Sequence, residues 1–137
     1  MNPDLAGPAQ SETAPVVRVV GSVVWAAALA GRLQGELAVI QHPDIIPLRN
    51  GLASDALDLV VIAATEESLS QTADLLIWMR ENRPQTRAVV VGPAAVRYRC
   101  CLLEAGAAIV VDYVWNAESV ARIARRHAAR STSLLDS

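Results

Sequence analysis

The chain alternates between short apolar runs and longer segments with helical signals, and it does so five times in succession. The runs, rich in Val, Ile, Leu and Ala, occupy residues 16–20, 37–41, 57–63, 88–91 and 108–113. Their apolar residues follow one another and do not alternate with polar ones, which is typical of strands covered on both faces. Such strands, separated by helices, predict one parallel sheet between two layers of helices.

The segments between the runs carry start and stop signals for helices. Ser22 is a good N-cap for a helix that ends near Gln34, where Gly35 follows. Two prolines and one glycine lie within residues 42–54, so we expect only a short or broken helix there. Further helices are predicted from Ser68 or Ser70 to about Asn82, from Ala95 to Ala105 with Gly106 as a left-handed cap, and from Asn116 to about Arg130. Right-handed crossovers then give a single doubly wound parallel sheet of five strands.

A length of 137 residues corresponds to about one domain. We expect a disordered leader over residues 1–15, the folded domain over 16–130 and a flexible tail over 131–137. The leader lacks the features of a signal peptide, and no apolar run reaches the ~18–20 residues of a membrane span. The adjacent Cys100 and Cys101 make no disulfide framework. These observations predict a cytoplasmic protein without a membrane partner.

The charged residues exclude several classes of chemistry. All 12 basic residues are arginines, so no ammonium group is available for a Schiff base or for clamping a phosphoryl group. The net charge of −2 argues against a general nucleic-acid binder, which would need a basic excess. His42 and His127 have no acid or cysteine at chelating spacing, so we expect no metal site at either.

Ligands of such folds bind at the carboxyl ends of the strands, and these ends carry few reactive groups here. The first strand is followed by Gly21 and Ser22, the third ends at Ala63, and the fourth is followed by Gly92. The glycines of a dinucleotide fingerprint are missing after Gly21. Asp112, near the end of the fifth strand, is a single carboxylate, which makes neither a metal site nor an acid–base pair. We therefore predict no catalytic residue, no metal and no cofactor.

Three segments of the chain carry motifs at the third and fourth strands and at the turn into the fifth: Leu57–Ile62, Arg83–Val91 and Leu103–Ala107. They resemble, in this order, the third strand, the helix-to-strand join that follows it and the Gly-Ala turn of the response-regulator receiver domain of bacterial signal transduction. The resemblance covers roughly residues 16–130. It implies a flavodoxin-like fold, a doubly wound three-layer α/β/α domain with five parallel strands.

The departures from the family pattern fall on its phosphorylation chemistry. Ala63 stands where the phosphoacceptor aspartate should be, and Gly21 and Ser22 stand where an acidic pair should hold magnesium. Gly92 replaces the switch Ser or Thr, and Tyr113-Val114-Trp115 replaces a Lys-Pro-aromatic triplet. Aspartate phosphorylation needs a carboxylate nucleophile, acids for the metal and a cation against the phosphoryl oxygens. The resemblance therefore implies a pseudo-receiver without enzymatic activity, which acts as a protein-interaction or dimerisation module.

Two surfaces are candidates for such contacts. The fourth helix, fifth strand and fifth helix carry complementary charges that could pair across a two-fold axis, with apolar support from Tyr98 or Leu102. These charges are Arg97, Arg99, Arg122 and Arg126 against Glu104, Asp112 and Glu118. On the third helix we expect Leu69, Ala73 and Leu76 to face the core, which leaves Leu75 and Trp78 partly exposed. The resulting prediction is a weak homodimer or a complex with another protein.

The first helix is apolar on a second face, formed by Val24, Ala28 and Gly31. Either the leader or a partner covers this face, or the small residues are tolerated at the surface. Two alternatives to an interaction module also stay open. The small residues Gly21, Ala63 and Gly92 would leave room for a ligand, which predicts a small-molecule sensor. The chain could also be part of an enzyme whose active residues come from a partner chain.

Overall fold

The computed structural model describes residues 15–53, 57–112 and 117–136. Five parallel strands form one sheet in the order β2-β1-β3-β4-β5. The strands are β1 (Val16–Val20), β2 (Ala38–His42), β3 (Leu59–Ala63), β4 (Arg87–Val91) and β5 (Ile109–Val111). The helices are α2 (Val23–Arg32), α3 (Ile45–Gly51), α4 (Leu69–Asn82), α5 (Pro93–Arg97), α6 (Arg99–Ala105) and α7 (Ala117–Asp136). The predicted flavodoxin-like fold is confirmed.

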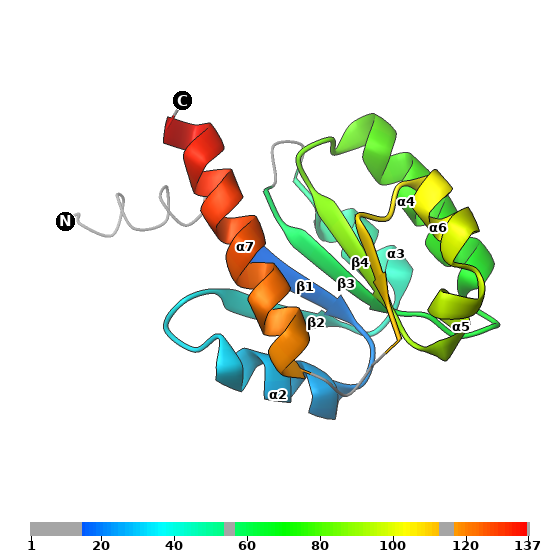
Figure 1. Ribbon diagram of the computed structural model, residues 1–137, viewed down its shortest axis with the longest axis horizontal. Coiled ribbons are helices and arrows are strands. Elements are labelled where there is room, and N and C mark those ends of the chain that lie inside the picture. The colour runs from blue at the N-terminus through cyan, green and yellow to red at the C-terminus, as the bar shows by residue number, and fades with distance from the viewer. Residues whose placement is uncertain (1–14, 54–56, 113–116, 137) are drawn as a thin grey trace.

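The sheet lies between two helical layers, with α2 and α7 on one face and α3, α4, α5 and α6 on the other (Figure 1). Alternate residues of the central strands enter opposite cores. Val19 and Val61 pack with Leu29 of α2 under the first layer, whereas Val60 and Ile62 pack under the second. Fully burying a side chain of this size contributes roughly 1.5–3 kcal/mol, so both layers are held mainly by apolar contacts.

Helix α2 begins as its sequence predicts. The Ser22 hydroxyl accepts hydrogen bonds from the backbone N–H groups of Val24 and Trp25, at 3.2 and 3.4 Å. Gly35, with a φ of 82°, follows the end of the helix. Between β2 and β3 the chain forms only the short helix α3, which contains Pro47. The short helix expected within residues 42–54 is therefore confirmed.

The helix expected over residues 95–105 is two helices. Pro93 opens α5, and the chain leaves the helical conformation at Tyr98 (φ −113°, ψ 32°) before α6 begins. Gly106 caps α6 with a φ of 130°, as predicted for a glycine at that position. Helix α7 continues past the predicted end at Arg130 to Asp136. Asn116, its expected N-cap, lies outside the described residues.

The buried face of α4 differs from the predicted one. Its buried residues are Thr72, Leu75, Leu76 and Met79. Leu69 and Ala73 are only partly buried, and Leu75 is only 2% exposed, so its assignment to an exposed patch is wrong. The stripe at positions 72, 75, 76 and 79 has the same helical spacing as the predicted stripe, but it lies on a different side of the helix. Packing against the sheet determines which side is buried.

Candidate functional site

The carboxyl ends of β1 and β3 meet where the receiver resemblance places phosphorylation. Strands β1 and β3 are direct neighbours, with Val20 opposite Ile62. A Cβ atom added to Gly21 would lie 3.1 Å from the Cβ of Ala63, so the two positions are in close contact. Neither residue carries a group that can bind a metal or accept a phosphoryl group.

The other residues predicted for this pocket have structural roles. The Ser22 hydroxyl is occupied as the N-cap of α2. Gly92 is buried and has a φ of 117°, which residues with a side chain rarely adopt, and its N–H donates to the carbonyl of Val111 at 3.0 Å. It therefore serves the tight turn from β4 into α5. Tyr113 lies outside the described residues.

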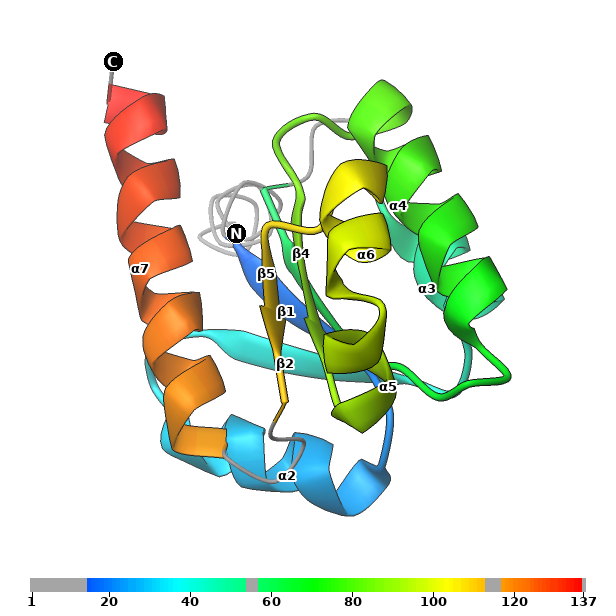
Figure 2. The ribbon, with the colours of Figure 1, turned by 45° about the vertical axis from the view of Figure 1, so that its right-hand side comes forward.

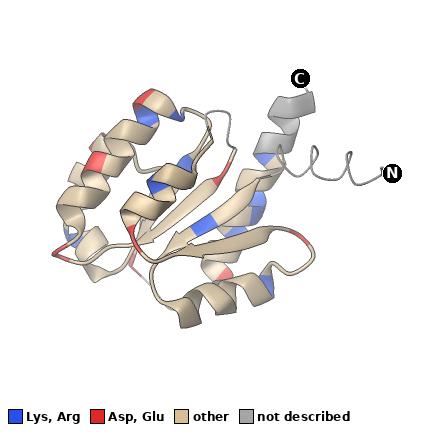
Figure 3. Ribbon diagram, turned by 180° about the vertical axis from the view of Figure 1, so that it is seen from behind, with Lys and Arg blue, Asp and Glu red and all other residues tan. Residues whose placement is uncertain are grey.

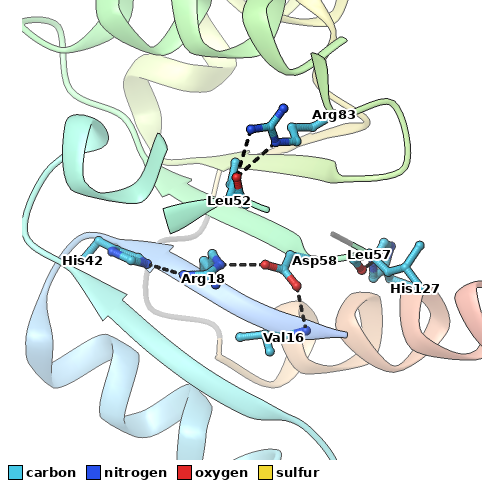
Figure 4. A network of polar contacts seen from close by, with 8 residues as sticks. All are labelled: Val16, Arg18, His42, Leu52, Leu57, Asp58, Arg83 and His127. Atoms are coloured by element: carbon cyan, nitrogen blue, oxygen red, sulfur yellow. Dashed lines mark hydrogen bonds and ion pairs between the residues drawn. The ribbon is translucent and has the colours of Figure 1, made fainter. Parts of the chain in front are cut away.

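A charged network links the first three strands (Figure 4). Arg18 of β1 donates through Nε to Oδ2 of Asp58 at 2.6 Å, and the N–H of Val16 donates to Oδ1 at 3.2 Å. The Nη1 of Arg18 donates to Nε2 of His42 at 3.1 Å. Burial lowers the pKa of His42, the charge of Arg18 lowers it further, and Asp58 opposes the shift. His42 therefore accepts this bond as a neutral ring, and the network is a structural link in which both oxygens of Asp58 already accept hydrogen bonds.

His127 of α7 connects this helix to the chain just before β3. Its Nε2–H donates to the carbonyl of Leu57 at 2.6 Å, and the residue is buried. Burial is the main cause that lowers its pKa, with smaller contributions from Arg87 and Arg130, while the bond to Leu57 and the charge of Asp58 raise it. Within residues 15–53, 57–112 and 117–136, no three His, Cys, Asp or Glu side chains gather where they could hold a metal ion.

The predicted charged face lies around the edge strand β5, with α6 and α7 on its two sides (Figure 2). Some of its charges are paired within the chain. Arg97 pairs with Glu66 at 3.1 Å, and Glu118 pairs with Arg32 at 2.9 Å and with Arg125 at 3.5 Å. The bond from Arg32 is the main cause that lowers the pKa of Glu118. Glu118 is thus already neutralised by its own chain.

The remaining residues of this face are exposed and lack ion pairs among the described residues: Arg99, Glu104, Asp112, Arg122 and Arg126. Tyr98 and Leu103 are also exposed, at 38% and 44%. Leu102 is 2% exposed, so the expected contribution of this side chain to an interface is wrong. The structure therefore keeps a mixed charged and apolar face at β5, smaller than predicted.

Trp78 of α4 is partly buried, and its ring is in contact with two arginines, one from α3 and one from the segment after α4. The guanidinium carbons of Arg49 and Arg83 lie 4.6 and 4.7 Å from the centroid of its ring. Arg83 also donates two hydrogen bonds to the carbonyl of Leu52, at 3.1 and 3.0 Å. These cation–π contacts make Trp78 a link between α3, α4 and the segment after α4. The sequence indicates an exposed aromatic residue but not these partners.

The second apolar face of α2 is exposed. Val23 and Val24 are 67% and 79% exposed, and Ala28 and Gly31 are also exposed. A cavity of about 200 Å³ lies between α2 and the other edge strand, β2. Its lining comprises Val23, Ala26, Ala27, Ala30, Val39 and Gln41. No residue of the described part of the chain covers the outer face of α2.

Two larger cavities open at the opposite end of the sheet from the predicted pocket. One, of about 320 Å³, lies between α7 and the beginnings of β3, β4 and β5. The other, of about 280 Å³, lies beside the end of α4 and the start of β4. Arg87 and Ala108 line both. The sequence pattern indicates ligand sites only at the carboxyl ends of the strands and does not predict these cavities.

Comparison with known proteins supports the fold. No family model matches the chain, and no curated protein matches it. One solved structure aligns with a TM-score of 0.62 and 19% sequence identity, over 86% of this chain and 91% of the other. That protein, from Burkholderia pseudomallei, bears the name "Putative pilus assembly-related protein". None of the described helices is both long and apolar enough to span a membrane. At this level of identity the alignment shows that the two chains share a flavodoxin-like fold.

Proposed function

We propose that this chain is a receiver-like domain that cannot be phosphorylated and that acts through protein–protein contacts in signal transduction or assembly. The observation that carries the proposal is the contact between Gly21 and Ala63 at the carboxyl ends of β1 and β3. These positions correspond, by resemblance, to the magnesium-binding acid and the phosphoacceptor. A receiver scaffold without these groups keeps only its surfaces for function.

The chemistry of the pocket supports the first half of the proposal. Transfer of a phosphoryl group to a carboxylate needs that nucleophile, a metal held by acids and a cation near the phosphoryl oxygens. Positions 21 and 63 supply none of them, and the sequence contains no lysine that a different alignment could bring in. Gly92 is required by its backbone conformation, so the position of the switch hydroxyl serves the turn instead.

The exposed face around β5 supports the second half. Arg122 and Arg126 of α7 and Asp112 after β5 are exposed, and each lacks an ion-pair partner in the described part of the chain. In a two-fold contact each acid can meet an arginine of the other copy. Exposed pairs contribute only about 0–1 kcal/mol each, so the association should be weak and sensitive to salt. The name of the Burkholderia protein favours assembly over signalling as the setting, and pilus assembly is the candidate.

Sedimentation velocity, combined with intact-mass measurement, tests both halves together. The protein is measured at low and high salt, with and without magnesium and a small phosphodonor. We expect an unchanged mass, a concentration-dependent association at low salt that weakens at high salt, and no effect of the phosphodonor on it. A phosphoryl adduct on an aspartate near β3 would refute the pseudo-receiver assignment. A monomer at high protein concentration and low salt would reject the dimer.

A further inference from the structure

The cavity of about 320 Å³ at the beginnings of β3, β4 and β5 combines apolar walls with arginines. Leu59, Val89, Ile109 and Ile123 supply the apolar lining. The polar lining consists of Arg87, Arg126, His127 and Arg130, with Ala108 completing the wall. No carboxylate is among these described lining residues. The cavity is thus a cationic pocket with an apolar floor.

The positions of these arginines follow from the fold. Arg87 is the first residue of β4 and pairs in register with Leu59 of β3. Because side chains alternate along a strand, Arg87 and Val89 point to the same face of the sheet, the one that α7 covers. On α7, Ile123, Arg126, His127 and Arg130 follow the spacing of one helix face. A strand and a helix thus direct their cationic groups to one place.

The arginines of this pocket differ from most others in the chain because their charge is not compensated. Elsewhere, Arg18, Arg32, Arg97 and Arg125 form ion pairs, Arg80 and Arg83 donate to backbone carbonyls, and Arg49 lies over Trp78. The side chains of Arg87, Arg126 and Arg130 form no hydrogen bond or ion pair with any residue in the described ranges, although the backbone N–H of Arg87 donates to the carbonyl of Asp58. Basic residues recur along α7 (Figure 3). Asp58 is close enough to influence His127, but both of its oxygens accept bonds from β1.

We propose that this pocket binds a small molecule that carries a phosphate group on an apolar or aromatic body. The guanidinium groups present planar sets of donors that match phosphate oxygens, and together they suit a dianion. The apolar floor suits a ligand body, and the volume lies at the lower end of the range for small-molecule sites, about 300–1,000 Å³. His127 also lines the pocket, and its Nε2–H is already donated to the carbonyl of Leu57.

Calorimetric titration at low ionic strength tests this assignment with three probes. Phenyl phosphate offers charge and an apolar body, inorganic phosphate offers charge alone, and benzyl alcohol offers a comparable apolar body alone. We expect phenyl phosphate to bind more tightly than inorganic phosphate, and benzyl alcohol to show no binding. Equal affinities for the two phosphates would overturn the proposal, because surface charge alone would then explain them. Absence of binding by phenyl phosphate would overturn it as well.

Variants locate the binding. Arg87→Gln and Arg126→Gln should each weaken phenyl phosphate binding by about tenfold, since each removes charged hydrogen bonds to the ligand. The matched control is Arg99→Gln, an exposed arginine on α6 outside the cavity lining. An equal loss in the control would place the binding elsewhere. A second outcome would also refute the proposal: the unmodified chain binds no phenyl phosphate, and Arg126→Gln weakens its self-association in sedimentation velocity. A second copy of the chain would then be the occupant of this face. The titration measures ligand binding and not phosphorylation or self-association. A chain that binds no phenyl phosphate would therefore leave the proposed function unaffected.

Discussion

At the scale of single residues, the fold accommodates charge beside the first three strands in a small network. Both carboxylate oxygens of Asp58 accept hydrogen bonds, and Nε and Nη1 of Arg18 donate. The side chains of Arg18 and Asp58 are only 16% and 7% exposed. Removing charges from water is costly, and a buried pair is tolerated only when its geometry and additional hydrogen bonds are good. The bond from Val16 and the neutral ring of His42 supply those additional bonds. Gly51 leaves room beside them, since a Cβ there would lie 3.1 Å from Nη1 of Arg18.

Removing the carboxylate should therefore be costly. We expect Asp58→Ala to lower the free energy of unfolding by about 3–5 kcal/mol, because it leaves the arginine buried without its counter-charge. Urea denaturation followed by circular dichroism measures this. The control is Arg97→Ala, which breaks an exposed pair with Glu66 and should cost only about 0–1 kcal/mol. Equal costs for the two variants would contradict the assignment of Asp58 to a buried structural network.

His127 should make stability depend on pH. Its pKa in the folded chain lies below the ordinary value of 6.5, mainly because of burial, so the fold favours the neutral ring. The contribution of His127 is therefore complete above about pH 6.5 and is lost as the pH falls through the lowered folded pKa. Arg87 and Arg130 act in the same direction as burial, whereas Asp58 and the Leu57 carbonyl oppose it.

The variant His127→Gln isolates this effect. Its amide can still donate to Leu57 but does not titrate. We expect the loss of stability between about pH 7.5 and pH 5 to be smaller in the variant than in the unmodified chain, as measured by urea denaturation at each pH. His42 has a lowered pKa as well and remains in both proteins, so the dependence should shrink without vanishing. An unchanged dependence would show that His127 does not contribute to it.

At the scale of elements, α2 shows how local signals and packing act together. Its cap is local, since Ser22 bonds to residues 24 and 25 of the same segment. Its buried side follows from the sheet, where Trp25, Ala26 and Leu29 enter the core. The remaining face stays exposed over Val24, Ala28 and Gly31, as the two-sided pattern allows. Whether a partner or the leader covers that face stays a prediction, because residues 1–14 lie outside the described ranges.

The cap of α2 is open to a direct test. We expect Ser22→Ala to lower the free energy of unfolding by about 0.5–2 kcal/mol and Ser22→Gly by only a few tenths. The reason is that alanine leaves the N–H groups of Val24 and Trp25 without their acceptor. The matched control is Ser70→Ala, an exposed serine inside α4, with a change within about ±0.5 kcal/mol. A Ser22→Ala variant as stable as the control would mean that water replaces the cap at no cost.

At the scale of the whole molecule, the two ends of the sheet have different characters. The carboxyl end carries the small residues Gly21, Ala63 and Gly92. The amino end carries Arg87, Arg126 and Arg130 around a cavity. The edges also differ, because a small cavity with a largely apolar lining separates β2 from α2, whereas β5 lies between α6 and the arginines of α7.

The charges of the β5 face lead to a specific prediction about self-association of the chain. Arg122→Glu or Asp112→Arg alone should weaken the low-salt self-association a few-fold, and the double variant should restore it, because each copy then offers the reversed pair. Sedimentation velocity over a concentration series measures the change. The control is Val24→Ser on the exposed face of α2, which should leave association unchanged. A dimer that is broken by Val24→Ser and is indifferent to the charge variants would place the interface on α2.

The sequence by itself determined the architecture and the character of the strand ends. Continuous apolar runs, caps such as Ser22 and turn glycines such as Gly106 are local signals, because they act within a few residues of the chain. Right-handed crossovers then restrict how the strands can be arranged, and the parallel sheet follows. The absence of reactive groups at Gly21, Ala63 and Gly92 was readable because the topology brings strand ends together whatever the details of packing.

Only the tertiary structure decided which residues meet. Arg18 and Asp58 are 40 positions apart, and His127 and Leu57 are 70 apart, so no local pattern indicates that they pair. The phase of α4 was mispredicted because both candidate stripes are helically spaced, and contact with the sheet selects the one that includes Leu75. The cationic pocket arises in the same way, since Arg87 and Arg126 converge only after α7 packs on the sheet. Which side chains form a hydrogen bond or ion pair depends on their distance in space, and this distance is determined by the packing of the whole core.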